Sequence, residues 1–532
     1  MYAPTRRSPI AVAARRSLTR LAVVTAAATG AFTLASCGAD YLDEAEVFRH
    51  LEASSTYQTP NDAVLAVNAA YTPLQYQGGY RRYPYLLDFL SGDLNITSGG
   101  RQLTAYPGFR FNAASPHIVP ATWETMFTGI ARANVVLERV PDIQFPDETL
   151  RERILGEAHF LRGLYYFELA RHYGGVPIYR RSFTGDLDDE LFQPARASVA
   201  EVYDFVEEDF RMARERLPES YDAEDKGRAT AGAALAMLGM THLYQEEYQQ
   251  AADALRPLVD GEVGDYALVD FEANFTADNE NNAESVFEIQ FATGVGRGFS
   301  DGDGASTAES NWMATALNPG RVRAFANGLP SVEVDDFFRR FPEDSLRRVF
   351  TIARPGDTWG TWAPIAEDPI AANQWRDRTG DVAGAPFLGV RKGTEGPSPV
   401  GFVQSPINFR LLRFAEVLLL FAEAENEANG GPTDAAYAAI NRVRERAGVD
   451  PLPEGLDQDE FFERIAIERR LELTFEFKRF FDIVRWSRRD GDVPDFAQTS
   501  AMPGFVEGRN EVFPIPEGEL ISNPNLEQNP GY

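Results

Sequence analysis

The sequence of 532 residues contains a single cysteine, Cys37, and only five histidines. With one cysteine no disulfide can form within the chain, so packing and hydrogen bonds must stabilise the fold. Zinc sites built from several cysteines are excluded as well, and the histidines lack the paired spacing of a zinc-binding helix. No phosphate-binding loop and no nucleophile elbow occurs. These patterns therefore assign no catalytic residue, no metal ligand and no cofactor.

Positive charge is also scarce. The chain has 51 Lys and Arg residues against 80 Asp and Glu residues, a formal net charge of −29. Its only lysines are Lys226, Lys392 and Lys478. Because nucleic acids and anionic lipids are bound through neutralisation of their phosphates, this balance excludes them as favourable partners. The acidic, arginine-rich composition fits a saline habitat and a GC-rich genome equally well.

Long apolar runs are absent apart from one near the N-terminus, between Leu21 and Phe32. It follows five arginines and, at about a dozen residues, is shorter than the roughly 20 that span a bilayer. With the small residues after it, this run predicts a secretory signal peptide over residues 1–36. Residues 34–37, Leu-Ala-Ser-Cys, resemble the lipobox of bacterial lipoproteins. We therefore expect the mature protein to start at Cys37 and to be attached to a membrane only by lipid on that thiol.

Several segments have the periodicity and the end signals of amphipathic helices. Apolar residues recur at helical spacing over residues 64–74, 123–140, 150–173 and 198–217. Ser198 and Glu201 have the spacing of a capping box, and the Gly-Gly-Val-Pro sequence at 174–177 predicts the end of the preceding helix.

Residues 229–258 carry the pattern of a tetratricopeptide helix pair. The small residues Gly239 and Ala251 are spaced so that two helices can approach closely. Residues 411–447 repeat the pattern with Ala424 and Ala436, although either copy could also be an ordinary α-hairpin. Stacked pairs of this kind form a curved helical wall. We predict a mainly α protein with a tetratricopeptide-like α-α superhelix, long irregular loops and a little β structure.

Two regions without helical periodicity concentrate aromatic side chains. Residues 76–118 are rich in Gly, Pro, Tyr and Arg, and residues 262–408 hold one alternating strand, 285–291, followed by glycine-rich loops. Loops of this length in a compact protein are functional or disordered, and their tryptophan density argues against disorder. The second region contains four of the six tryptophans, namely Trp312, Trp359, Trp362 and Trp375.

Short segments along nearly the whole mature chain resemble the SusD/RagB family of outer-membrane nutrient-binding lipoproteins. Each is unspecific alone, but in this order and behind a lipobox they identify the chain as similar to that family. The segments are 123–134, 156–167, 173–177, 227–230, 412–424, 441–448, 468–473, 480–486, 513–516 and 529–532, among them Gly227-Arg228-Ala229-Thr230 and Asn529-Pro530-Gly531-Tyr532.

This resemblance implies a non-catalytic lipoprotein on the outer face of the outer membrane. It implies that the protein captures oligosaccharide and delivers it to a SusC-like TonB-dependent transporter, over which it sits as a lid. Residues 37–532 would form one body, with an N-terminal half (37–220), a tetratricopeptide-like repeat (221–260), a loop-rich ligand region (262–408) and a C-terminal half (409–532). Three alternatives stay open: the same role with a peptide ligand, a periplasmic tetratricopeptide scaffold protein, and a secreted glycosidase.

A carbohydrate site needs aromatic rings for the apolar faces of sugars and polar side chains for their hydroxyl groups. The two aromatic regions supply both. Trp312 is the first candidate, because the glycine-rich run before it would expose its ring. Any of the aromatic candidates could instead attach a loop to the scaffold. The other candidates are Tyr83, Asn95, Arg101, Tyr106, Trp359 and Trp362.

Charged side chains on the apolar helices are interpreted as structural. Arg413, Glu416, Glu423 and Glu427 are spaced to share one side of a helix, and we expect them to form ion pairs between stacked helices. Residues 301–304, Asp-Gly-Asp-Gly, begin like a calcium-binding loop but lack its later acidic ligands. They therefore do not predict a calcium site.

Overall fold

The computed structural model describes residues 57–96, 105–182, 193–292, 309–316, 330–332, 345–353, 389–394 and 405–532. The chain divides into two compact units, residues 1–58 and 59–532, and the second carries the fold described below. The expected signal peptide and Cys37 lie outside the described residues, so both stay predictions. None of the helices in the described ranges is long and apolar enough to cross a membrane.

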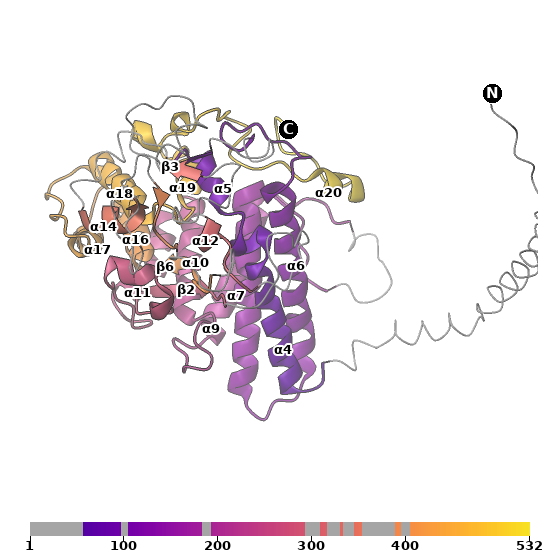
Figure 1. Ribbon diagram of the computed structural model, residues 1–532. Coiled ribbons are helices and arrows are strands. Elements are labelled where there is room, and N and C mark those ends of the chain that lie inside the picture. The colour runs from indigo at the N-terminus through magenta and orange to yellow at the C-terminus, as the bar shows by residue number, and fades with distance from the viewer. Residues whose placement is uncertain are drawn as a thin grey trace, which may run out of the picture. The chain divides into compact units, whose positions relative to one another are not determined.

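Four long helices build the N-terminal part of this unit, and each packs against the next (Figure 1). Capping boxes begin two of these helices, at Thr59 for the first and at Ser198 for the last. The capping box at Ser198 was predicted from the sequence. Gly174 follows the third helix with a φ of 75°, a conformation that favours glycine. The four helices are α4 (Pro60–Tyr71), α6 (Ile118–Arg139), α7 (Glu148–Tyr173) and α9 (Val199–Arg216).

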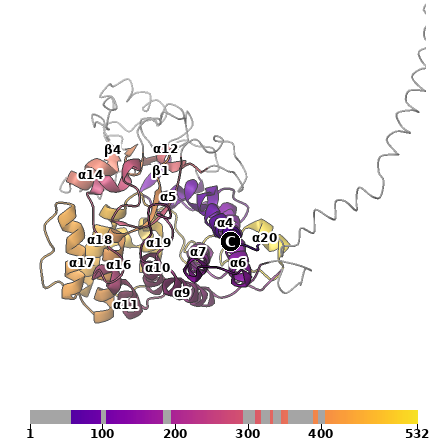
Figure 2. The same ribbon diagram turned by 90° about the horizontal axis from the view of Figure 1, so that it is seen from below.

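The predicted helix pairs follow, as α10 (Ala231–Tyr244) with α11 (Tyr248–Val259) and α16 (Phe414–Asn429) with α17 (Asp434–Arg446). A Cβ atom on Gly239 would lie 2.5 Å from Cγ of Leu255, so α10 and α11 approach as closely as the small residue predicts. α11 packs on α16, and α16 packs on α18 (Gln458–Leu473). Figure 2 shows the helices following one another from α4 and α6 through α9–α11 to α16–α18. The predicted mainly α, tetratricopeptide-like scaffold is confirmed.

The described strands form three antiparallel pairs: β1 (Leu94–Ile96) with β3 (Pro330–Val332), β2 (Ser285–Ile289) with β6 (Phe409–Arg413), and β4 (Ile352–Ala353) with β5 (Gly389–Val390). β2 confirms the predicted strand. The predicted second helix pair started too early, because residues 411–413 belong to β6 and α16 begins at Phe414. Pairing with β2, more than 120 residues away, keeps these residues extended.

Short elements connect this scaffold. The aromatic region 76–118 was expected to be irregular, yet it contains a π-helical turn, η2 (Gln77–Arg81), and α5 (Tyr85–Leu90). The other short helices are η1 (Thr72–Gln75), η4 (Val140–Asp142), η5 (Phe271–Phe275), η6 (Ala277–Asn279), α12 (Met313–Ala316), α14 (Ser345–Thr351), α19 (Arg479–Trp486), η9 (Asp495–Ala497), η10 (Thr499–Ala501) and α20 (Glu517–Ser522).

Three of the four charged residues predicted to share one helix and join helices do so through buried ion pairs, whereas the fourth, Arg413, lies at the end of β6. Glu416 binds Lys478 at 3.1 Å, Glu427 binds Arg489 at 3.0 Å, and Glu423 binds Arg485. Each partner lies on the C-terminal segment 478–489. These buried ion pairs fasten that segment to α16, which supports the structural interpretation over acid–base chemistry.

Candidate ligand-binding site

The two aromatic regions meet at the Trp312 side chain. The ring of Trp312 lies 5.5 Å from the ring of Tyr85, and the guanidinium carbon of Arg82 lies 4.8 Å above the indole. The same guanidinium lies 5.3 Å from the ring of Tyr83. Trp312 and side chains nearly 200 residues or more before it in the sequence thus form one group. We call it the Arg82–Trp312 cluster: Arg82, Tyr83, Tyr85, His117 and Trp312.

A close backbone contact positions the first of these segments. A Cβ atom on Gly78 would lie only 1.9 Å from the backbone oxygen of Ala121 in α6, so no other residue fits without moving the main chain. The turn η2 can therefore lie directly on α6. Arg82 follows it, and its guanidinium donates a 3.0 Å hydrogen bond to the side chain of Gln77.

Buried hydrogen bonds position the second segment. Asn311 pairs with the backbone of Ser405, and its side chain donates to the Ile407 oxygen at 2.8 Å. Its side-chain oxygen accepts from the amide of Ala314 at 3.2 Å at the start of α12. Arg81 joins the two segments directly, because its Nε donates to the Ser310 oxygen at 3.1 Å. Trp312 is therefore fixed on both sides along the chain.

His117 completes the cluster at the start of α6. Its Nδ1 lies 3.4 Å from the Tyr83 hydroxyl, and its backbone has a φ of 79°, which costs a non-glycine residue about 1–3 kcal/mol. Burial, and then the charge of Arg82, lower the pKa of His117, while burial raises the pKa of Tyr83. At neutral pH the cluster therefore presents one cation among neutral hydrogen-bonding groups.

The predicted site residues lie in different parts of the structure. Trp312 and Tyr83 lie in the cluster, but the expectation that Trp312 is exposed was wrong, because only 6% of it is accessible beneath Arg82 and Tyr85. Tyr106 is buried, stacks on Phe111 at 5.3 Å and donates a hydrogen bond to the Pro116 oxygen at 2.6 Å. It therefore packs within the fold, which is the alternative stated above for any aromatic candidate. Asn95 lies in β1 opposite Ser331.

Three predicted residues, Arg101, Trp359 and Trp362, lie outside the described residues, as does segment 301–304. Sequence reasoning missed Arg82 and His117. Arg82 could have been found, because it lies directly before the candidate Tyr83 in the arginine-containing aromatic region 76–118. Nothing in the sequence linked His117 to that tyrosine, since 34 residues separate them.

One group in the described parts of the chain has the composition of a metal site. Glu207, His242 and Glu247 bring three potential ligand atoms within 4.8 Å of one another. However, His242 Nδ1 already lies 2.6 Å from Glu247, and Glu207 pairs with Arg211 at 2.5 Å and accepts from Gln245 at 2.6 Å. These contacts satisfy the carboxylates without an ion.

The chain is similar to proteins of one family. Residues 276–532 match the model of the SusD family, and residues 111–243 match a model described as starch-binding associating with outer membrane. A SusD-like protein P2 of Formosa agariphila is 28% identical over 91% of this chain and 94% of its own. A SusD-like protein of Bacteroides ovatus is 26% identical over 87% of this chain and 82% of its own.

Solved structures agree with the helical architecture. A laminarin-binding SusD-like protein superimposes with a TM-score of 0.71 at 28% identity, covering 90% of this chain and all of the other. A SusD homolog from Bacteroides thetaiotaomicron gives a TM-score of 0.72 at 24% identity over 91% of this chain and 99% of its own, a likeness of fold.

Proposed function

We propose, from the premise that this chain belongs to the SusD/RagB family, that it binds carbohydrate at the Arg82–Trp312 cluster. Sugar rings are recognised by aromatic surfaces together with a few well-placed hydrogen-bond donors. The cluster places the cation of Arg82 over an indole and a phenol, and because Tyr83, Tyr85 and Trp312 are themselves buried, Arg82 is the group that faces a ligand.

The observation that carries this proposal is the position of Arg82. Its guanidinium lies on Trp312, and the residue as a whole is only half-buried, so we expect it to donate hydrogen bonds to sugar hydroxyl groups while the aromatic rings fix its orientation. A pocket for acidic or basic peptides would need more charged side chains than this cluster has. Glycan therefore ranks above peptide.

The proposal extends to location and partner. The family model for residues 111–243 is described as associating with the outer membrane, which supports attachment there through lipid on Cys37. Delivery of the bound oligosaccharide to a SusC-like TonB-dependent transporter is part of the same proposal. The role is binding without cleavage, because the cluster contains a cation and neutral groups but no pair of carboxylates for glycoside hydrolysis.

Affinity electrophoresis of the purified protein tests binding. Laminarin is the first polysaccharide to include, because a structurally similar protein is described as binding it. The protein should be retarded by at least one polysaccharide of a panel, and Trp312→Ala should abolish that retardation. Unchanged mobility in every gel, or retardation by Trp312→Ala equal to that of the wild type, would contradict the proposal. Release of reducing ends would contradict the non-catalytic role.

A further inference from the structure

The turn between α18 and α19 holds two phenylalanines in a strained backbone conformation. It comprises residues 474–478, Thr-Phe-Glu-Phe-Lys, all of which are buried, and we call it the 474–478 turn. Phe475 has a φ of 63° and Phe477 a φ of 62°, a conformation that glycine adopts readily and that is costly for a bulky residue. Such strain persists only where surrounding contacts fix it, and it concentrates at functional sites.

Buried polar contacts on both sides of Phe477 hold this conformation. Glu476 accepts hydrogen bonds from Arg413 at the end of β6. Lys478 donates a 2.6 Å hydrogen bond to the backbone oxygen of Leu411 in the same strand. Both neighbours of Phe477 are thus fastened to β6, so its ring is held against that strand.

The ring of Phe477 begins a stack of three rings that ends at η2. It lies 5.8 Å from the ring of Phe409 in β6, with an angle of 7° between the two planes. Phe409 in turn lies 5.1 Å from the ring of Tyr80, at an angle of 24°. The Tyr80 hydroxyl donates a hydrogen bond to Glu168 in α7. The stack therefore connects the 474–478 turn with η2, which lies far from it in the sequence.

Arg82 is tied to η2, so the stack also bears on the Arg82–Trp312 cluster. Its guanidinium donates to the Gln77 side chain, and the backbone amide of Tyr83 donates to the Gln77 oxygen at 3.0 Å. Gln77 is the first residue of η2. A shift of η2 would therefore move Arg82, the residue that is expected to face a sugar.

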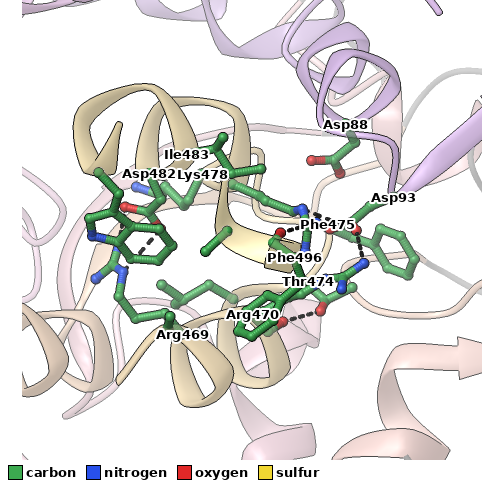
Figure 3. Close-up of a pocket in the computed structure, with 15 residues that line it drawn as sticks. Asp88, Asp93, Arg469, Arg470, Thr474, Phe475, Lys478, Asp482, Ile483 and Phe496 are labelled. Carbon is green, nitrogen blue, oxygen red and sulfur yellow. Dashed lines mark hydrogen bonds and ion pairs between the residues drawn. The ribbon is translucent and has the colours of Figure 1, made fainter. Parts of the chain in front are cut away.

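Small cavities border the stack. One of about 20 Å³ lies between η2, α6, α7 and the rings of Phe409 and Phe477. Another, of about 50 Å³, lies between the same two rings and α12. Figure 3 shows a third, of about 20 Å³, which the turn lines through Thr474, Phe475 and Lys478. Because close packing is interrupted there, the contacts between the rings gain weight in fixing η2.

We propose that Phe477 and Phe409 are positioning residues for the carbohydrate site. Their rings hold η2 through Tyr80, and η2 keeps the Arg82 guanidinium over Trp312 in the orientation that meets a sugar. This inference rests on the proposed function. It adds that carbohydrate affinity depends on buried rings of the C-terminal scaffold, which act through Arg82.

Hydrogen exchange of the purified full-length chain, measured by mass spectrometry, tests the positioning without a ligand. Phe477→Leu should raise the exchange rate of residues 77–83 at least about 3-fold, because exchange reports local opening. Phe462→Leu is the matched control, since Phe462 is also buried but packs on Trp486 in a separate apolar group. Equal exchange of residues 77–83 in both variants would overturn the proposal. Should Phe477→Leu not fold, Phe409→Leu enters the same comparison.

A double-mutant cycle tests whether the rings act through Arg82. With laminarin, or with the polysaccharide of the panel that retards the wild type, Phe409→Leu should weaken binding about 3- to 10-fold in isothermal titration. In the Arg82→Gln background it should weaken binding by less than about 2-fold, because the guanidinium through which it acts is gone. Phe462→Leu should bind like the wild type.

The outcomes of the cycle separate this inference from the proposed function. Equal weakening by Phe409→Leu in both backgrounds, or wild-type affinity of Phe409→Leu, would overturn the inference. If Arg82→Gln alone binds as tightly as the wild type, the proposed function fails instead. The exchange comparison still decides in that case whether the rings hold η2.

Discussion

Arg413 binds Glu476 through two parallel hydrogen bonds, from Nε at 2.9 Å and from Nη2 at 2.8 Å. Its Nη1 also reaches Glu472 at 2.5 Å and Glu284 at 2.7 Å. The Arg413 side chain is fully buried. One guanidinium therefore joins the end of β6, the residue before β2 and the end of α18, three places that are distant in the sequence.

Arg413→Gln should destabilise the fold strongly. Removal of one partner from a buried ion pair typically costs about 3–5 kcal/mol, because the remaining charges are left uncompensated. Chemical denaturation should show this loss in the free energy of unfolding. The exposed pair Arg180–Glu208, at 3.3 Å, provides the control, and Glu208→Gln should change stability by less than about 1 kcal/mol. Similar losses in both variants would refute this account of the buried network.

Gly78→Ala should damage both the fold and the site, because its Cβ atom would overlap the backbone oxygen of Ala121. We expect a lower Tm and weaker carbohydrate binding, since η2 would have to move away from α6. Gly518→Ala in α20 is the matched control, because a Cβ atom there meets nothing within 4 Å. That variant should be neutral or up to about 1 kcal/mol more stable, as alanine favours helices. Wild-type behaviour of Gly78→Ala would contradict the close approach.

Arg82→Gln should weaken carbohydrate binding by about 10- to 100-fold, the equivalent of ~1.5–3 kcal/mol for a hydrogen bond from a charged group. Isothermal titration with the polysaccharide found by electrophoresis provides the measurement. Arg132→Gln serves as the comparison, because this arginine also lies over a tyrosine, Tyr76, at 5.8 Å but outside the cluster. Equal affinities of the two variants would show that Arg82 does not contact the ligand.

Asp88→Asn should change how stability depends on pH. The unfolded chain titrates this carboxyl near ~3.9, whereas its pKa in the folded state is raised by burial. Below pH ~3.9 the carboxyl group is protonated in both the folded and the unfolded state, so it does not lower the free energy of unfolding of the wild type. As the pH rises above that value only the unfolded state ionises, so the wild type loses stability up to the folded pKa.

At pH 7, Asp88→Asn should therefore be more stable than the wild type, by ~1.4 kcal/mol for each unit of pKa displacement. At pH 3.5 the two proteins should be equally stable. Denaturation at both pH values measures the difference in the free energy of unfolding. A variant less stable than the wild type at pH 7 would contradict this, because it would mean that an ionised Asp88 carboxylate stabilises the folded state.

The scaffold could be predicted because its signals are local. Ser198 and Glu201 form their capping box within one helical turn, and Gly239 marks a contact between consecutive helices. β6 was missed because residues 409–413 are apolar enough for a helix, and only their distant partner β2 makes them a strand. Local pattern therefore fails where a long-range contact decides the conformation.

The site was only partly predictable for the same reason. Aromatic composition selected the two regions that contribute to the Arg82–Trp312 cluster, in which Tyr83 and Trp312 both contact Arg82. The burial of Trp312 depends on Arg82 and Tyr85, more than 220 residues earlier, and no pattern near Trp312 reveals them. His117 likewise reaches Tyr83 only because α6 packs against η2.

A crystal structure of the protein with an oligosaccharide of the polysaccharide that it binds tests the central claim most directly. The account predicts sugar density in contact with the Arg82 guanidinium at the Arg82–Trp312 cluster. Density for the sugar at another surface, with the Arg82–Trp312 cluster left uncontacted, would contradict it.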